Sequence, residues 1–418
     1  MIDVWRTLKR RFLIFLTVFG PATIAAMADN DASGVATYSI AGATLGYPIL
    51  FVLFIITFAL GLTQEMGIRL ALVTRKGLGD LIREHFGVRA SVLVFFCLFI
   101  ANMGTIVVDL AAVKTTSTIL HLPATPAIMV LVIVSFFFVT KGNYKINQNI
   151  MLLSCLFYLA YIFSAFKANP NWGAAVTNVF VPVNMKFNAQ YVRNFIVIGL
   201  GVLGTTITPW GQFFISSFAF DKNIETQRIK YSQFETYWGA FLTNFFSFFM
   251  IVATAATLFA HRIPLISGEQ AALAIKPFAG ELAGSLFAVG ILNAGFMGIV
   301  TVSLSTAYAF AEFFGISGSL NTSFDRGRAF YLIFLVQLIL ASVIVMMPSV
   351  SLFQLAIATQ ALNAIMLPIV FYYLIKLTNN KEIMGTYINT PLQKNFAVIT
   401  TIAICVASLL AITLTVIR

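Results

Sequence analysis

The sequence is poor in charge. Only 10% of its 418 residues are Asp, Glu, Lys or Arg, and 59% are hydrophobic. An ordinary soluble domain carries about 25% charged residues. So few charges cannot cover the exterior of a soluble protein of this length. The composition therefore excludes a soluble enzyme, a nucleic-acid-binding protein and a disordered chain.

Cysteine and histidine are also scarce, with three of each. The cysteines lie far apart inside apolar runs, which is typical of buried free thiols and not of a disulfide or a metal cluster. The histidines fall in expected loops or at helix ends. These residues are Cys97, Cys155, Cys405, His85, His121 and His261. We accordingly expect no enzymatic activity and no bound cofactor.

Long apolar runs dominate what is present. A run of about 20 apolar residues is long enough to cross a bilayer as a helix. The loops between the runs are too short for a separate soluble domain. We predict an all-α polytopic membrane protein with eleven membrane helices, over residues 12–45, 47–73, 91–120, 125–140, 149–167, 192–220, 234–260, 280–311, 328–347, 350–377 and 394–417.

The basic residues predict the orientation. With the N-terminus in the cytoplasm, 18 of the 26 Lys and Arg residues lie in inner segments and six lie outside. Inner loops of membrane proteins carry this excess. We expect a multi-pass protein of the cell membrane with the N-terminus inside and the C-terminus outside. The net charge of +11 then requires no nucleic-acid partner. We interpret Met1–Leu13 as the lead-in to the first helix and not as a cleaved signal.

Two predicted helices contain residues that interrupt a membrane helix. The first carries Asp29, Asn30, Asp31, Ser33 and Gly34 deep in its span, and each acid there costs about 2.5–3.5 kcal/mol on insertion scales. Glycine and short polar residues suit an unwound stretch. The sixth carries a glycine- and threonine-rich run that ends in Pro209. Proline removes a backbone donor, although a simple kink is an alternative explanation for that helix alone.

Breaks in the first and sixth helices are typical of transporters built from two inverted five-helix repeats. The site in such proteins lies at the midplane, between the two discontinuous helices. We therefore predict a first repeat over residues 1–175, a second over residues 190–380, and an additional helix over residues 394–418.

The polar groups at the two breaks are mostly oxygens. An oxygen environment with a carboxylate suits a hard divalent cation such as Mg²⁺, Mn²⁺ or Ca²⁺. Met27 adjoins the first break, and we interpret it as apolar packing, with a sulfur ligand as the alternative. A neutral amino acid is the competing substrate, but an acidic pair would repel its carboxylate unless an amine paired there.

The motifs at these breaks resemble the NRAMP family of divalent-metal transporters. Asp31-Ala32-Ser33-Gly34, followed by Ala36-Thr37 and Ala41-Gly42, stands where the family has Asp-Pro-Gly-Asn with the same two dipeptides. Thr208-Pro209-Trp210 stands where the family has Met-Pro-His. Residues 359–368 and 380–385 resemble the tenth helix and the loop that follows it.

The resemblance implies a set of metal-binding positions and a LeuT-like fold. Asp31 matches the metal-binding aspartate, and Gly34 replaces the ligand asparagine. Ala28 and Thr205 stand where backbone carbonyls face the metal, and Thr208 replaces the methionine ligand. Gln360 matches a polar residue that faces the site. The transported ion, Mg²⁺ or Mn²⁺, is the substrate and not a resident cofactor.

The departures from the family motif point to magnesium. A hydroxyl oxygen at Thr208 is hard, whereas the methionine sulfur is soft. Gly34 removes a bulky ligand, which predicts a wider cavity for an ion that keeps several waters. The pattern resembles the NRAMP-related magnesium transporter branch, in which Mn²⁺ is also accepted.

Most of the family's proton-relay residues are missing. Asp109 matches the first helix-three acid, but Ala112 and Trp210 replace the second acid and the histidine, and residues 330–347 carry no charge. We expect metal entry without proton coupling. A divalent ion that moves inward through about 100 mV gains about 4.6 kcal/mol.

Several polar residues have two interpretations. Asp29 and Asn30 either coordinate waters around the ion or cap the outer half-helix. Asp109 serves either transport or structure, and Trp210 either closes the inner path or is a packing wedge. Glu65 and Arg69, spaced i, i+4, are expected to form a structural ion pair.

The sequence thus predicts a monomeric secondary transporter that moves Mg²⁺, and also Mn²⁺, into the cytoplasm by alternating access. One alternative is a proton-coupled Mn²⁺/Fe²⁺ importer of the main family type. A second is an amino-acid permease on the same fold. A channel or receptor would not require two matched helix breaks.

Overall fold

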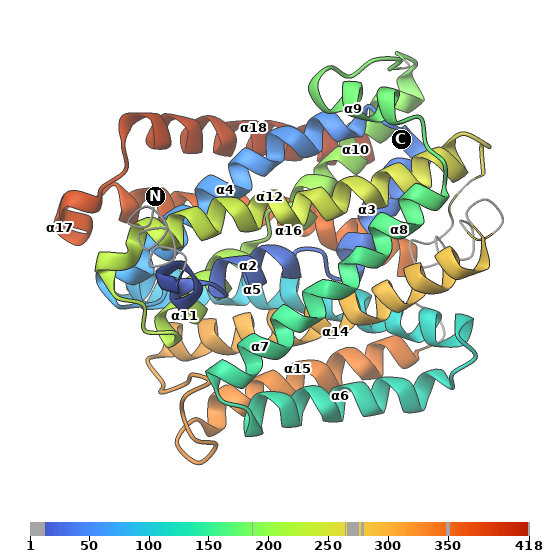
Figure 1. Ribbon diagram of the computed structural model, residues 1–418. Coiled ribbons are helices and arrows are strands. Elements are labelled where there is room, and N and C mark those ends of the chain that lie inside the picture. The colour runs from blue at the N-terminus through green and yellow to red at the C-terminus, as the bar shows by residue number, and fades with distance from the viewer. Residues whose placement is uncertain are drawn as a thin grey trace, which may run out of the picture.

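The computed structural model describes residues 13–185, 187–263, 265, 276, 280–347 and 352–416. The basic residues of the N-terminal segment up to Arg11 lie outside these ranges. The described residues form helices and no strands, and most of the long helices run roughly along one direction (Figure 1). The α-helices are α2 (Pro21–Ala28), α3 (Ala32–Leu45), α4 (Ile49–Thr74), α5 (Leu78–Ile119), α6 (Ala124–Lys141), α7 (Tyr144–Ser154), α8 (Leu159–Lys167), α9 (Trp172–Phe180), α10 (Ala189–Thr206), α11 (Pro209–Asp221), α12 (Ile229–Thr254), α14 (Glu281–Phe314), α15 (Arg328–Met346), α16 (Leu352–Thr378), α17 (Lys381–Met384) and α18 (Pro391–Val416).

Ten of the eleven predicted membrane crossings are confirmed. Within the described residues, ten helical segments are long and apolar enough to span a bilayer. The first predicted crossing is not among them because the break divides it into the short helices α2 and α3. The sixth crossing, Ala189–Asp221, is one of the ten, although it too is divided, into α10 and α11. The fold is therefore an all-α bundle whose first and sixth crossings are discontinuous.

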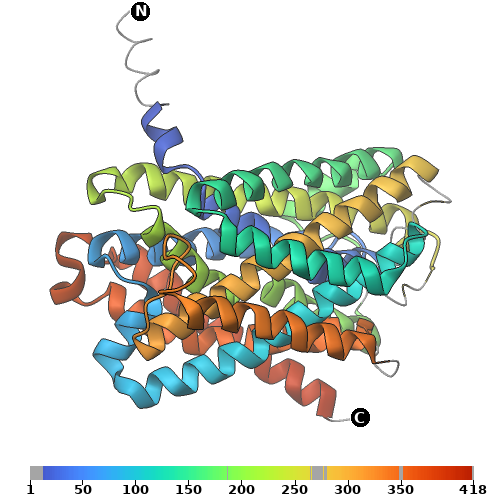
Figure 2. The same cartoon turned by 90° about the horizontal axis from the view of Figure 1, so that it is seen from below.

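Two features differ from the sequence prediction. Helix α5 begins at Leu78, before the predicted residue 91, and changes direction at Gly87, where φ is 83° (Figure 2). The segment before this bend, residues 78–86, contains several charged residues, so the apolar pattern did not predict it as part of the membrane helix. Helix α9 was not predicted, because nine residues are too few to read as a crossing; the side chain of Asn171 caps it by accepting from Ala174 N.

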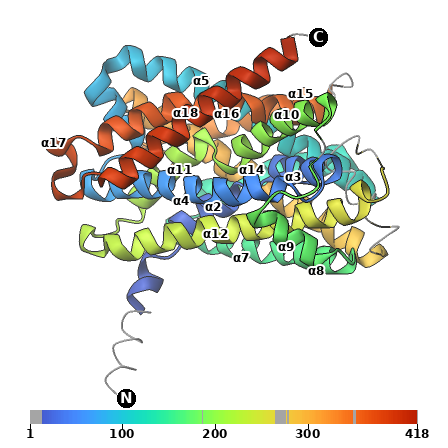
Figure 3. The same ribbon diagram turned by 90° about the horizontal axis from the view of Figure 1, so that it is seen from above.

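The broken helices form the centre of the bundle. Every residue of α2 is buried, and so are nearly all residues of α11. Helix α14 packs along α5, and α12 packs along α4. Helix α18 lies outside, against α16 and α10 (Figure 3). The outer helices expose large apolar side chains, as a bilayer requires; on α6 these are Met129, Val130, Ile133, Val134 and Phe137.

Helix α10 approaches α16 closely at a glycine. A Cβ atom built on Gly204 would lie 2.1 Å from the carbonyl oxygen of Gln360. Small residues allow such backbone contacts between membrane helices. This contact holds α10, the first half of the sixth crossing, against the helix that carries Gln360.

The predicted ion pair between Glu65 and Arg69 is confirmed at 2.7 Å, and both side chains are almost fully buried. Arg69 also donates to Asn389 Oδ1 at 2.6 Å and to the Tyr387 carbonyl, in the segment before α18. Gln233 Nε2 donates to Glu65 Oε1 at 2.7 Å. Because a buried ion pair needs such extra partners, this group connects α4, α12 and the C-terminal segment.

Replacing Arg69 tests this structural role. In Arg69→Ala the carboxylate of Glu65 keeps its burial but loses its charge partner, which costs about 3–5 kcal/mol. We expect a clearly lower thermal unfolding midpoint for the purified protein in detergent. The matched control is Arg328→Ala, because the ion pair of Arg328 with Asp325 is exposed. Equal midpoints for the two variants would contradict the assignment.

Candidate functional site

The first break is organised by Asp31. Helix α2 ends at Ala28 and α3 begins at Ala32, so Asp31 is the N-cap residue of α3. Its Oδ1 accepts from Gly34 N at 2.6 Å and from Ser33 Oγ at 2.7 Å. An N-cap side chain satisfies backbone donors that the helix leaves unpaired. The predicted metal-binding carboxylate is thus also the group that starts the outer half-helix.

The second break is organised in the same way by Thr208. Helix α10 ends at Thr206 and α11 begins at Pro209. Thr208 Oγ1 accepts a hydrogen bond from Gly211 N at 3.1 Å and donates one to Asp29 Oδ1 at 2.9 Å. This single hydroxyl caps one half-helix and connects the two breaks.

Oxygen atoms from both breaks converge beside Gly34. A Cβ atom built there would lie 2.5 Å from the carbonyl oxygen of Asp29, 3.0 Å from Thr205 Oγ1 and 3.3 Å from Asp31 Oδ1. Thr205 Oγ1 is buried and has no hydrogen-bond partner among the described residues. The wider cavity that Gly34 was expected to leave is not present at this point, because the Asp29 carbonyl fills the space.

The backbone carbonyl of Ala28, which is predicted to face the metal, accepts a hydrogen bond within the break. Its oxygen accepts from Asp31 N at 3.0 Å. At Thr205, the side-chain hydroxyl lies beside Gly34, 3.0 Å from a Cβ atom built there. Among the described residues no group of three His, Cys, Asp or Glu side chains forms a metal centre. A cation at this position would be held by one or two carboxylates together with hydroxyl and carbonyl oxygens.

Ser33 connects Asp109 and Gln360 to the first break. Its backbone N donates to Asp109 Oδ1 at 3.0 Å, and its hydroxyl accepts from Gln360 Nε2 at 2.6 Å. Asn363 Nδ2 in turn donates to Gln360 Oε1 at 3.1 Å. Gln360 therefore lies at the predicted site, but it acts through Ser33, a role the motif comparison did not assign.

Asn30 and Asp29 do not cap the outer half-helix, so that interpretation is wrong. The N-cap residue directly precedes the first helical residue, Ala32, and is therefore Asp31. The amide of Asn30 donates to the carbonyl and the hydroxyl of Thr243, both at 2.9 Å, and accepts from Ser247 Oγ at 2.7 Å. Asn30 thus attaches the break to α12, whereas the Asp29 side chain faces Thr208.

Trp210 is fully buried one residue into α11. Its indole Nε1 has no partner among the described residues, and its carbonyl accepts from Ser305 Oγ at 2.7 Å. The ring lies 6.4 Å from that of Phe214. These contacts fit either a packing wedge or a closed inner path.

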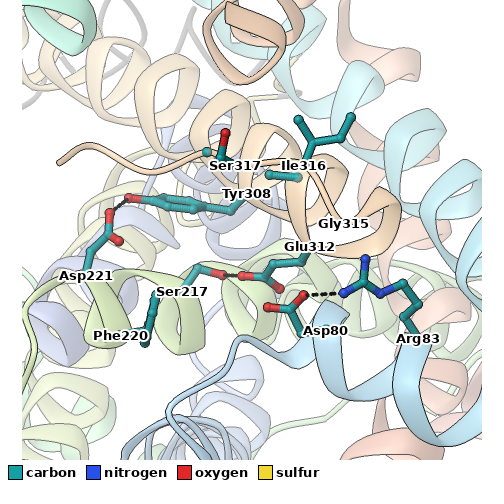
Figure 4. A pocket seen from close by; sticks show the side chains of 12 residues that line it. Asp80, Arg83, Ser217, Phe220, Asp221, Tyr308, Glu312, Gly315, Ile316 and Ser317 are labelled. Carbon is teal, nitrogen blue, oxygen red and sulfur yellow. Dashed lines mark hydrogen bonds and ion pairs between the residues drawn. The ribbon is translucent and has the colours of Figure 1, made fainter. Parts of the chain in front are cut away.

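A polar pocket of about 340 Å³ lies at the end of the bundle where α11 ends and α5 begins (Figure 4). Glu312 of α14 accepts from Gly79 N at 2.8 Å and from the Ser217 hydroxyl, and it thereby joins three helices. Asp221 accepts from the Tyr308 hydroxyl at 2.6 Å. Helix α11 is thus hydrogen-bonded here to α14 through Ser217 and Asp221.

The start of α2 is fastened on the same side of the bundle. Glu235 Oε1 of α12 accepts from Gly20 N at 2.7 Å and from Thr23 N at 3.0 Å. Lys222 donates to the carbonyl of Phe19. The half-helices α2 and α11 are therefore both held, at the ends away from the breaks, by side chains of neighbouring helices.

Solved structures share this fold. A manganese transporter from Eremococcus coleocola superposes with a TM-score of 0.78 at 18% identity, over 95% of this chain and 86% of that one. MhsT, solved in complex with L-phenylalanine, superposes with a TM-score of 0.63 at 12% identity, over 94% of this chain and 98% of that one. The bundle is thus of the LeuT type.

Sequence relatives cover nearly the whole chain. It is 25% identical over 406 residues to a divalent metal cation transporter MntH from Staphylococcus aureus, over 91% of this chain and 86% of that protein. It is 22% identical over 402 residues to an MntH from Caldanaerobacter subterraneus, over 92% and 90%. The family model described as natural resistance-associated macrophage protein-like matches residues 22–414. The chain therefore belongs to the Nramp family, whose members here are membrane transporters of divalent metal ions.

Proposed function

We propose that this transporter moves Mg²⁺, and also Mn²⁺, into the cytoplasm by alternating access. The observation that carries the proposal is the convergence of Asp31 Oδ1, the Asp29 carbonyl and Thr205 Oγ1 at the buried meeting point of the two breaks. Three oxygens, one from a carboxylate, suit a hard divalent cation.

The preference for magnesium rests on the ligand types. Thr208 places a hydroxyl, not a sulfur, at the second break, and this hydroxyl is fixed between Asp29 and Gly211. Hard oxygen ligands do not favour Mn²⁺ or Fe²⁺ in the way that a thioether does. This ligand set supports the magnesium branch of the family as the assignment for this chain.

The fastened ends of the half-helices support the proposal of alternating access, because their release would open a path. We assign residues 1–175 and 190–380 to two inverted repeats and residues 394–418 to an additional helix, with the N-terminus in the cytoplasm and the C-terminus outside. Opening toward the cytoplasm then requires α2 and α11 to leave Glu235 and Glu312. We expect the protein to act as a monomer, because both breaks belong to one chain.

We further propose that transport is not coupled to protons. Trp210 replaces a histidine, and helix α15 carries no charged side chain between Ala329 and Met346. The membrane potential alone supplies about 4.6 kcal/mol for a divalent ion at about 100 mV. The buried Asp109 Oδ2, which has no partner among the described residues, favours the proton-coupled importer as the second candidate.

Removal of the central carboxylate tests the site. We expect Asp31→Ala to weaken Mg²⁺ and Mn²⁺ binding by tenfold or more, because about 1.4 kcal/mol of lost interaction gives a factor of ten. Calorimetric titration of the purified protein measures both ions. Asp325→Ala is the control, since Asp325 is an exposed acid in a loop. Unchanged binding in Asp31→Ala would overturn the site.

A sulfur at position 208 tests the selectivity argument. We expect Thr208→Met to shift the preference toward Mn²⁺ over Mg²⁺ by about tenfold relative to Thr208→Ala. Both variants lose the cap and the hydrogen bond to Asp29, so the comparison isolates the sulfur. The measurement is competition between the two ions in calorimetry. Equal preferences in the two variants would show that residue 208 is not a ligand.

Proton movement is measured directly in proteoliposomes. With an inside-negative potential and a pH dye in the lumen, we expect Mg²⁺ uptake with no acidification of the lumen. The same liposomes report whether Asp109→Asn retains uptake, as an uncoupled carrier should. Metal-dependent acidification that Asp109→Asn abolishes would establish the proton-coupled alternative.

A further inference from the structure

The carboxylates of Asp29 and Asp31 leave the first break toward different sides. A Cβ atom built on Gly298 of α14 would lie 2.7 Å from Asp31 Cβ and 2.1 Å from Asp109 Oδ2, so those two acids lie against α14. Asp29 instead lies against Thr208 of α11, and its Oδ2 is 3.4 Å from Gln64 Nε2 of α4. The Asp29 side chain therefore contacts α4 and α11, whereas that of Asp31 lies against α14.

Two buried glutamines near Asp29, on α4 and α11, have amide atoms without a hydrogen-bond partner among the described residues. Gln64 and Gln212 are both 0% exposed. Gln64 Oε1 and both amide atoms of Gln212 have no hydrogen-bond partner within the described part of the chain. Because an unsatisfied buried amide costs about 1–3 kcal/mol, three such atoms in one place call for a ligand.

Gln212 lies at the contact between α11 and α4, near the face of α4 that carries Gln64. Gln212 Oε1 lies 4.0 Å from a Cβ atom built on Gly67, which follows Gln64 by three residues on the same face of α4. A Cβ atom built on Gly211 would lie 3.5 Å from Asp29 Oδ1. The carboxylate and both amides thus border one buried region, one turn of α11 beyond Thr208.

This set of groups matches a hydrated divalent cation. Mg²⁺ gives up its waters reluctantly and is commonly held through one or two carboxylates while it keeps several of them. The waters around the ion donate hydrogen bonds outward and need acceptors. Asp29, Gln64 Oε1 and Gln212 Oε1 supply acceptors, and water-mediated contacts of this kind are nearly as favourable as direct ones.

We propose that Asp29, Gln64 and Gln212 form a second cation station, on the inner side of the site at Asp31. The ion passes to it from Asp31 with part of its water shell retained. This inference rests on the proposed function, and it adds residues that the motif comparison with the family did not assign.

The test compares uptake of Mg²⁺ and Mn²⁺ by Gln212→Leu and Gln64→Leu in proteoliposomes. Loss of one hydrogen bond to a charged, hydrated ion corresponds to about tenfold or more. We expect Mg²⁺ uptake to fall at least about tenfold, and Mn²⁺ uptake to fall by less than about threefold, because Mn²⁺ depends less on a retained water shell. Gln212→Asn, which keeps an amide, should recover part of the Mg²⁺ uptake.

Gln337→Leu is the matched control. Gln337 of α15 is also fully buried with Oε1 unpartnered in the described chain, but its Nε2 donates to the Ile333 carbonyl at 2.9 Å, away from both breaks. This variant should leave the ratio of the two uptake rates unchanged. It measures the cost of removing a buried amide from the bundle without altering the station.

Two results would overturn the station. One is unchanged Mg²⁺ uptake in both leucine variants; the other is an equal loss for the two ions. If Gln212→Leu does not fold, Gln212→Glu replaces it: the added carboxylate should strengthen Mg²⁺ binding in calorimetry several-fold, and no change would reject the station. Neither result affects the proposed function, whose metal site is tested separately by metal binding in Asp31→Ala.

Discussion

The structure depends on ending four half-helices inside an apolar bundle, where no solvent satisfies their backbone groups. Each unpaired donor in hydrocarbon is costly, so a break persists only where side chains replace the missing partners. Asp31 and Thr208 perform this function for α3 and α11. The residues that make the breaks possible are therefore the same residues that the proposed cation would contact.

Capping and cation binding are compatible because both side chains keep lone pairs that the caps do not use. An ionised carboxylate offers about four lone-pair sites, and Asp31 Oδ1 uses two of them for Gly34 N and Ser33 Oγ. The Thr208 hydroxyl donates to Asp29 and accepts from Gly211, which leaves one lone pair. A cation could therefore bind between the breaks without uncapping either half-helix.

The crossings, both breaks and the Glu65–Arg69 pair could be predicted because each depends on composition or on spacing within one helix. The contacts of Ser33 with Gln360 and of Thr208 with Asp29 join residues 327 and 179 positions apart, and no local pattern encodes them. Gln64 and Gln212 did carry a local signal, a costly amide inside a span. The space beside Gly34 was misjudged because the backbone, not a side chain, fills it.

The charge balance of the centre is consistent with the proposed binding of a cation there. Glu65 has Arg69, but within the described residues neither Asp29 nor Asp31 forms an ion pair. A buried carboxylate without a charge partner costs several kcal/mol. Asp109, which lies against α14 beside Asp31, is likewise buried and forms no ion pair among the described residues. On the proposed function, a divalent ion would offset part of this cost, which gives the carrier a physical reason to bind its substrate before α2 and α11 leave Glu235 and Glu312.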